Sequence, residues 1–74
     1  MTQNTITVAL ESSPTELHKI LKFEGLVSSG AEAKNVIAEG LVTLNGDVET
    51  QKRKKIVEGD MIEFDNNTLI ITLA

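Results

Sequence analysis

The sequence predicts an α+β domain in which two short helices pack on each other and on a sheet. Three observations support this fold class: two apolar stripes at helical spacing, several short segments of strand character, and an Asn45-Gly46 pair between two of those segments. Helices of about ten residues are not stable alone, so each must bury its stripe in a shared core. The chain has 74 residues, and we expect residues 1–74 to form one domain.

The first strand and the first helix are expected within residues 5–25. Thr5 to Leu10 alternate polar and apolar side chains, as a half-buried strand does. The four residues that begin at Ser13, Ser-Pro-Thr-Glu, have the spacing of a capping box with proline at the first helical position. Gly25 can end the helix that follows. Its apolar stripe consists of Leu17, Ile20 and Leu21.

The second helix is predicted from Ser29 to Gly40. Ser29 and Glu32 have capping-box spacing, and Gly40 stands where a left-handed residue commonly ends a helix. Ala33 at the centre of its stripe allows a close approach between the two helices. The stripe consists of Ala33, Val36 and Ile37.

The remaining strands are expected around tight turns. Asn45-Gly46 favours a type I′ hairpin turn between residues 41–44 and 47–50. A two-residue loop would set Leu44 opposite Asp47, whereas a three-residue loop with a bulge would bring Val48 to the side of Leu44; we favour the bulge. Two further strands are expected at residues 61–64 and 68–73, joined by a turn at 65–67, with the last strand interior to the sheet.

The charge is unevenly distributed along the chain. Net charge is −4, but four of the seven basic residues are consecutive, at Lys52 to Lys55. Without this run, 3 basic residues stand against 11 acidic ones, a net charge of −8. Clustered cations are the electrostatic footprint of a polyanion-binding surface. The alternative interpretation is a solvated loop that protects an exposed sheet edge from aggregation.

Several function classes have no support in the sequence. The chain has no cysteine, so it has neither a disulfide nor a thiolate metal site, and its one histidine, His18, has no second histidine to complete a metal site. The carboxylates are dispersed, and no phosphate-cradling Gly-rich loop is present. We therefore expect no catalysis, no metal and no cofactor. With neither a signal peptide nor a long apolar run, a cytoplasmic protein without membrane contact is expected.

Part of the sequence resembles the S4 RNA-binding domain family, and more closely the small stand-alone S4-like proteins of bacteria. The resemblance lies in the segment LHKILKFEGLVSSGAEAKNVIAEGLVTLNGDV and in the later segment VEGDMIEF. The resemblance covers residues 16–64, about two-thirds of the chain. It rests on the order and spacing of a set of anchors rather than on one motif: Leu17, Leu21, Gly25, Leu26, Ser28, Ser29, Glu32, Ala33, Lys34, Ile37, Gly40, Val42, Asn45, Gly46, Gly59 and Asp60.

The resemblance implies two helices packed on a small, mostly antiparallel sheet, an αL RNA-binding motif, with RNA along the helix pair and the adjoining hairpin. Family members commonly have arginine where this chain has Glu16, Gly30 and Asn35. The RNA contacts carried over by position, with the adjacent basic run added, are Lys19, Ser28, Ser29, Lys34, Asn45, Lys52, Arg53, Lys54 and Lys55.

We therefore expect a non-catalytic module that recognises structured RNA by shape and phosphate spacing, with ribosomal and transfer RNA as candidates. We also expect no exposed aromatic side chains, on which binders of single strands stack bases. The alternative is a protein-interaction module that uses the basic strip or an exposed edge of the strand TLIITL, residues 68–73. Binding that survives ribonuclease would indicate a protein partner.

Overall fold

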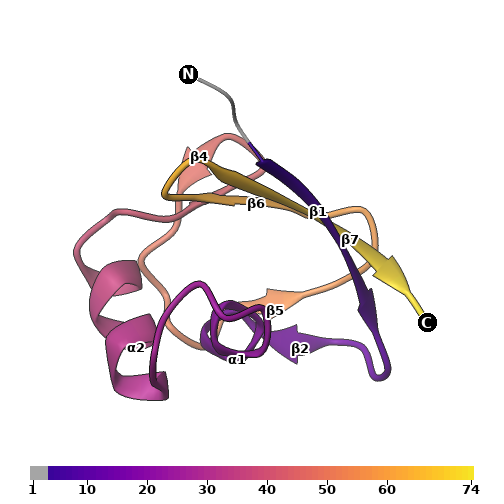
Figure 1. Ribbon diagram of the computed structural model, residues 1–74, viewed down its shortest axis with the longest axis horizontal. Helices are drawn as coiled ribbons and strands as arrows, with labels where there is room; N and C mark the ends of the chain where they lie inside the picture. Colours follow the sequence, from indigo (N-terminus) through magenta and orange to yellow (C-terminus); the bar gives the residue numbers. More distant parts are fainter. Residues whose placement is uncertain (1–3) are drawn as a thin grey trace.

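A five-stranded mixed sheet faces two helices in the computed structural model, which describes residues 4–74 (Figure 1). The strand order is β1-β7-β6-β3-β4, and β1 runs parallel to β7 while the other neighbours are antiparallel. A second, two-stranded sheet pairs β2 with β5. The elements are β1 Asn4–Leu10, β2 Thr15–Glu16, α1 Leu17–Phe23, α2 Gly30–Ala38, β3 Thr43–Leu44, β4 Asp47–Val48, β5 Lys55–Ile56, β6 Met61–Phe64 and β7 Asn67–Leu73.

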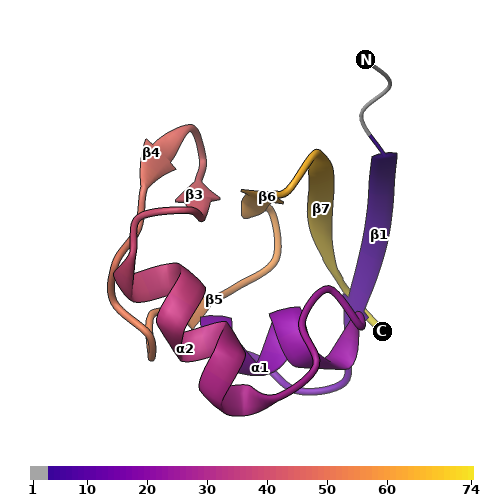
Figure 2. The same ribbon diagram turned by 60° about the vertical axis from the view of Figure 1, so that its left-hand side comes forward.

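The predicted helices and their stripes are confirmed. Both helices lie on the same side of the curved five-stranded sheet (Figure 2), and the core between them is entirely aliphatic among the described residues. Val36 is only partly buried, at the margin of this core. The core side chains are Val8, Leu10, Leu17, Ile20, Leu21, Val27, Ala33, Ile37, Val42, Ile56, Ile62, Leu69 and Ile71.

Both helices end in the same glycine motif. The Gly25 and Gly40 amides donate to the carbonyls of Lys22 and Ile37, and both glycines have positive φ. In each case the next amide donates to a carbonyl five residues back, which completes a Schellman motif. Glycine is required at these two positions because a Cβ disfavours the left-handed conformation. The predicted C-terminal stops are therefore confirmed.

The predicted capping box at Ser13 is wrong. The helix begins only at Leu17, its N-cap is Glu16, and no side chain caps it. The preceding residues instead form β2, which pairs with β5 in the register Glu16 to Lys55. The first two helical amides are satisfied by backbone, because Leu17 and His18 donate to the carbonyls of Lys54 and Lys52.

The bulged loop favoured for the first hairpin is also wrong. Asn45 and Gly46 form a two-residue loop with φ of 53° and 91°, and Leu44 pairs with Asp47. The register is tolerated because β4 is a two-residue edge strand exposed along its length, so Val48 stays 62% exposed and no acidic side chain enters the core.

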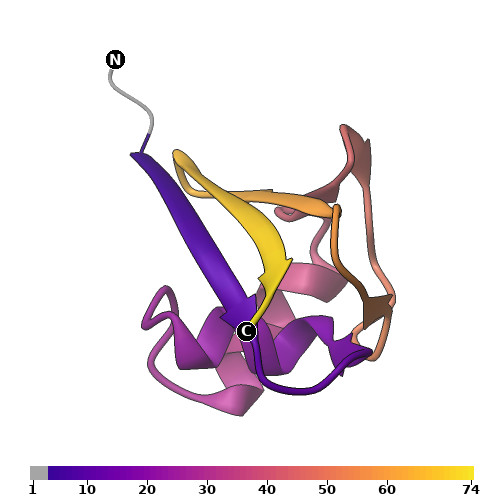
Figure 3. The ribbon, with the colours of Figure 1, turned by 90° about the vertical axis from the view of Figure 1, so that its right-hand side faces the viewer.

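The last strand, β7, is interior as expected. It pairs with β1 over seven residue positions and with β6 on its other side, and Figure 3 shows β1 and β7 running side by side. Its backbone edges are therefore occupied, and strand addition at TLIITL, the edge considered for a protein partner, is not available. The strands at the two edges are β1 and β4.

Candidate functional site

The basic run is fixed to the first helix by backbone hydrogen bonds. The Leu17 amide donates to the Lys54 carbonyl over 2.9 Å, and the His18 amide donates to the Lys52 carbonyl over 3.2 Å. The β2–β5 pairing adds a second attachment, with Glu16 beside Lys55. Residues 52–55 are therefore held at the N-terminal end of α1 and do not form a free loop.

The Glu16 carboxylate lies at the centre of a cluster of cations. Its Oε1 accepts from His18 Nε2 at 3.0 Å and lies 3.6 Å from Lys19 Nζ, while its Oε2 lies 3.9 Å from Lys55 Nζ. The hydrogen bond from His18, followed by the charges of Lys19, Lys55 and Arg53, lowers the pKa of the Glu16 carboxyl below its ordinary value. One carboxylate thus joins cations from α1 and from the basic run.

We define the basic strip as five of the predicted site residues that this arrangement brings together. Lys54 is half-buried, and the other four are exposed to solvent. Exposed ammonium and guanidinium groups attract phosphates, and a guanidinium can hold one bidentately. The basic strip comprises Lys19, Lys52, Arg53, Lys54 and Lys55.

Lys34 is not joined to the basic strip by a contact. It is half-buried on α2, and within residues 4–74 its ammonium makes no hydrogen bond or ion pair. The helix α2 packs against α1, so Lys34 belongs to the neighbouring helix of the pair.

The two predicted serines are engaged at the start of α2. The Ser29 hydroxyl accepts from the Glu32 amide at 3.1 Å, which confirms the predicted N-cap. The Glu32 carboxylate accepts from the Ser28 amide at 2.7 Å and lies 3.3 Å from the Ser28 hydroxyl. A phosphate at this helix start would therefore have to displace the Glu32 carboxylate.

Asn45 connects two turns. Its side-chain amide donates to Asp60 Oδ1 at 3.1 Å, and its side-chain oxygen accepts from the Met61 amide at 2.9 Å. Its own backbone amide donates to the Met61 carbonyl. The side chain is thus committed to holding the β3–β4 turn against the start of β6.

The structure contradicts one expectation about the surface. Phe23, the last residue of α1, is 76% exposed, although no exposed aromatic side chain was expected. The exposure of Phe23 could have been predicted from helical periodicity. At about 100° per residue, Phe23 lies outside the stripe formed by Leu17, Ile20 and Leu21. No comparable pattern in the sequence indicated the role of Glu16, which depends on the β2–β5 pairing.

The structure contains little that points to another kind of site. Among residues 4–74, no group of three or more histidine and carboxylate side chains is placed to hold a metal ion. No helix in the described part of the chain is long and apolar enough to cross a membrane.

Comparison with known proteins agrees with the fold. The family model described as S4 domain matches residues 8–72. Over 64 residues the chain is 47% identical to YbcJ of Escherichia coli strain K12, whose name proposes an RNA-binding function; the match covers 85% of this chain and 91% of the relative. YbcJ of Shigella flexneri, named as uncharacterised, matches with the same identity and coverage.

Solved structures give the same result. The solution structure of Escherichia coli YbcJ, described as revealing an ALFAL motif involved in RNA-binding, matches with a TM-score of 0.66 and 39% identity, over 97% of this chain and 90% of that one. The crystal structure of ribosomal protein S4e from Thermoplasma acidophilum has a TM-score of 0.63 at 24% identity, over 77% of this chain and 30% of that one, and supports the fold alone. The S4 domain model matches most of the chain, and YbcJ of Escherichia coli is 47% identical to it. The chain therefore belongs to the S4 domain family, which is non-catalytic.

Proposed function

We propose that this protein binds structured RNA through the basic strip. The S4 domain membership and the RNA-binding function proposed for its relative YbcJ support the ligand class. The observation that carries the proposal is the Glu16 cluster, in which one carboxylate and two backbone hydrogen bonds gather five cations at the start of α1. Five positive groups and one negative group leave that surface strongly positive in an acidic chain.

The binding mode follows from this charge distribution. The strip neutralises phosphates and releases their counterions, while the rest of the chain, with 2 basic residues against 11 acidic ones and a net charge of −9, repels RNA that does not fit the strip. Folded RNA presents phosphates at fixed spacing across a shallow groove, which suits recognition by shape. Ribosomal and transfer RNA are the candidate ligands, and the cytoplasm is the compartment that would supply them.

The proposed interface extends beyond the strip to the second helix and the hairpin. Lys34, Ser28, Ser29 and Asn45 are its further proposed contacts. The ammonium of Lys34 is available for a phosphate. The serines and Asn45 already have structural partners, so we assign them a smaller share of the affinity.

A charge-reversal variant tests the proposal. Arg53→Glu should weaken binding to unfractionated transfer RNA, and the plot of log affinity against log salt should become less steep by about one unit because one phosphate contact is lost. Lys22→Glu is the matched control, since it makes the same change in charge at an exposed lysine outside the strip. Affinities are measured by fluorescence anisotropy from about 50 to 200 mM salt, the range over which such contacts lose most of their strength.

The outcomes separate the two candidate functions. Tighter binding of transfer RNA than of poly(U), with a loss confined to Arg53→Glu, supports the proposal. An unaltered salt slope in Arg53→Glu, or an equal loss in Lys22→Glu, contradicts the strip as the binding surface. A partner that is captured by the protein and retained after ribonuclease treatment supports the protein-interaction alternative instead.

A further inference from the structure

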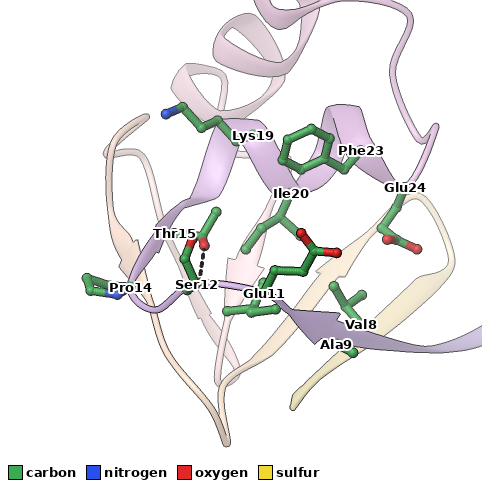
Figure 4. Close-up of a pocket in the computed structure, with 11 residues that line it drawn as sticks. Val8, Ala9, Glu11, Ser12, Pro14, Thr15, Lys19, Ile20, Phe23 and Glu24 are labelled. Carbon is green, nitrogen blue, oxygen red and sulfur yellow. Dashed lines mark hydrogen bonds between the residues drawn. The ribbon is translucent and has the colours of Figure 1, made fainter. Parts of the chain in front are cut away.

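A hollow next to the basic strip has an exposed aromatic side chain on its rim. It measures about 530 Å³ and lies between α1, the end of β1 and the β1–β2 loop (Figure 4). Its apolar lining includes the buried side chains of Val8 and Ile20, which are 6% and 1% exposed, and Phe23 stands beside them at 76% exposure. A cleft of this size is within the range of small-ligand sites, and no described residue covers the ring of Phe23.

The hollow is continuous with the proposed RNA-binding surface. Lys19 lines it and also lies 3.6 Å from Glu16, so this lysine belongs both to the strip and to the hollow. Lys19 and Phe23 are four residues apart on α1, which places them on the same side of the helix, one turn from each other. A nucleotide with its phosphate at Lys19 would therefore place its base on the side of α1 that carries Phe23, about one helical turn away.

Two carboxylates determine what the hollow accepts. Glu11 and Glu24 line it from the β1 end and from the end of α1, and Figure 4 shows the Glu11 carboxylate between Ile20 and Glu24. Negative charge at these positions keeps phosphate out of the hollow itself. Carboxylates accept hydrogen bonds from the exocyclic amino groups of bases, so the pairing of an aromatic ring with acceptors suits a base rather than a phosphate.

We propose that this hollow binds a single unpaired nucleobase of a structured RNA, stacked on Phe23, with its amino edge toward Glu11 and Glu24. The inference rests on the proposed function and adds one base-reading contact to recognition by shape. Guanine, adenine and cytosine carry exocyclic amino groups and uracil does not, so a bulged uridine is the disfavoured occupant.

Three RNA hairpins of identical stem, one fully paired, one with a single bulged guanosine and one with a single bulged uridine, test the proposal. The protein should bind the bulged hairpin about tenfold more tightly, in line with the measured worth of one base stacked on an aromatic ring. Phe23→Ala should remove this advantage and leave the affinity for the paired hairpin unchanged. Phe23→Tyr should retain it, because the ring remains. The bulged uridine hairpin should bind more weakly than the guanosine one.

A fluorescent base gives a direct readout of stacking. The emission of 2-aminopurine at the bulge should be quenched on binding the wild-type protein and not on binding Phe23→Ala. Leu41→Ala is the matched control, because it truncates another exposed apolar side chain, 54% exposed, outside the hollow. It should leave both the affinity and the quenching at their wild-type values.

Each result that contradicts the inference is distinct from failure of the proposed function. Equal affinity of the wild-type protein for the paired and bulged hairpins overturns the base site while leaving the strip intact. Equal loss on both hairpins in Phe23→Ala also overturns it, and equal binding of uridine and guanosine bulges overturns the role of the carboxylates. Arg53→Glu should weaken both hairpins by the same factor; if neither hairpin binds the wild-type protein, the proposed function and the base site fail together.

Discussion

Glu16 has three roles in one residue: it ends β2, it is the N-cap of α1, and its carboxylate joins the cations of the strip. The carboxylate contacts Lys19 and Lys55, which would otherwise repel each other. Its presence lowers the local positive charge but keeps the remaining cations close to one another.

The pH dependence of stability follows from the lowered pKa of Glu16. A carboxyl whose pKa is lower in the folded than in the unfolded protein stabilises the fold above its unfolded value, near 4.5, and this contribution is lost as pH falls through the folded value. Glu16→Gln should therefore show a smaller fall in the free energy of unfolding between pH 7 and pH 3 than the wild type, measured by urea denaturation. Glu58→Gln, at an exposed turn carboxylate, is the control and should behave as wild type. Parallel curves for wild type and Glu16→Gln would contradict the assignment.

Single residues were predictable where local geometry alone fixes them. Gly25, Gly40 and the Asn45-Gly46 turn follow from the need for positive φ, and the structure has positive φ at all of them. The side-chain bonds from Asn45 to Asp60 and Met61 were not predictable, because they join segments about fifteen residues apart. Exposure of Phe23 could have been inferred from helical spacing, whereas the hollow beside it depends on where β1 ends.

At the scale of elements, the two predicted capping boxes show what determines whether a Ser-x-x-Glu pattern caps a helix. At the second box the Ser29 hydroxyl caps α2 by accepting from the Glu32 amide, and the Glu32 carboxylate accepts from the neighbouring Ser28 amide. Ser13 has the same spacing to Glu16, but Glu16 is drawn into β2 by its pairing with Lys55, and the helix starts later. Local sequence supplied both patterns equally, and only a contact distant in sequence distinguishes them. The same pairing fixes the strip, so its geometry could not be obtained from local patterns.

The close approach of the two helices makes a prediction about Ala33. This side chain is fully buried on α2, which packs against α1. Ala33→Leu should overpack the contact and lower the free energy of unfolding by roughly 1–3 kcal/mol, measured by urea denaturation. Ala38→Leu places the same side chain at an exposed position of the same helix and should change stability little. An unchanged denaturation midpoint in Ala33→Leu would refute tight packing between the helices.

At the scale of the molecule, the fold class was predictable and the order of the strands was not. Periodicity and turn residues gave the helices and most of the longer strands, and the resemblance implied how the helices pack on the sheet. The parallel pairing of β1 with β7 joins strands whose paired residues lie 63 positions apart. Periodicity carries no information on such a pairing, because alternation only shows that a strand has one buried face. The cationic cluster is likewise a property of the assembled fold, since it combines side chains from α1 and from residues 52–55.

The strands differ in how many neighbours they have, and this predicts that they differ in the free energy of local opening. The amides of Ile71 and Glu49 make backbone hydrogen bonds of equal length, 3.0 Å, to the carbonyls of Asp60 and Val42. Ile71 lies in β7, which has a neighbour on each side and buries side chains in the core, whereas Glu49 follows the exposed edge strand β4. Local opening costs little where few apolar contacts are lost, so the Glu49 amide should exchange with solvent deuterium far faster than the Ile71 amide.

Hydrogen exchange followed by NMR on the full chain measures this difference. The exposed turn residue Asn66 provides the reference for an unprotected amide, and Ile71 should exchange at a rate close to that of global unfolding. Equal protection of Glu49 and Ile71 would contradict a weakly held hairpin. The basic strip lies outside this hairpin and is attached to α1 by two backbone bonds and the β2–β5 pairing, so its shape should not change when the hairpin opens.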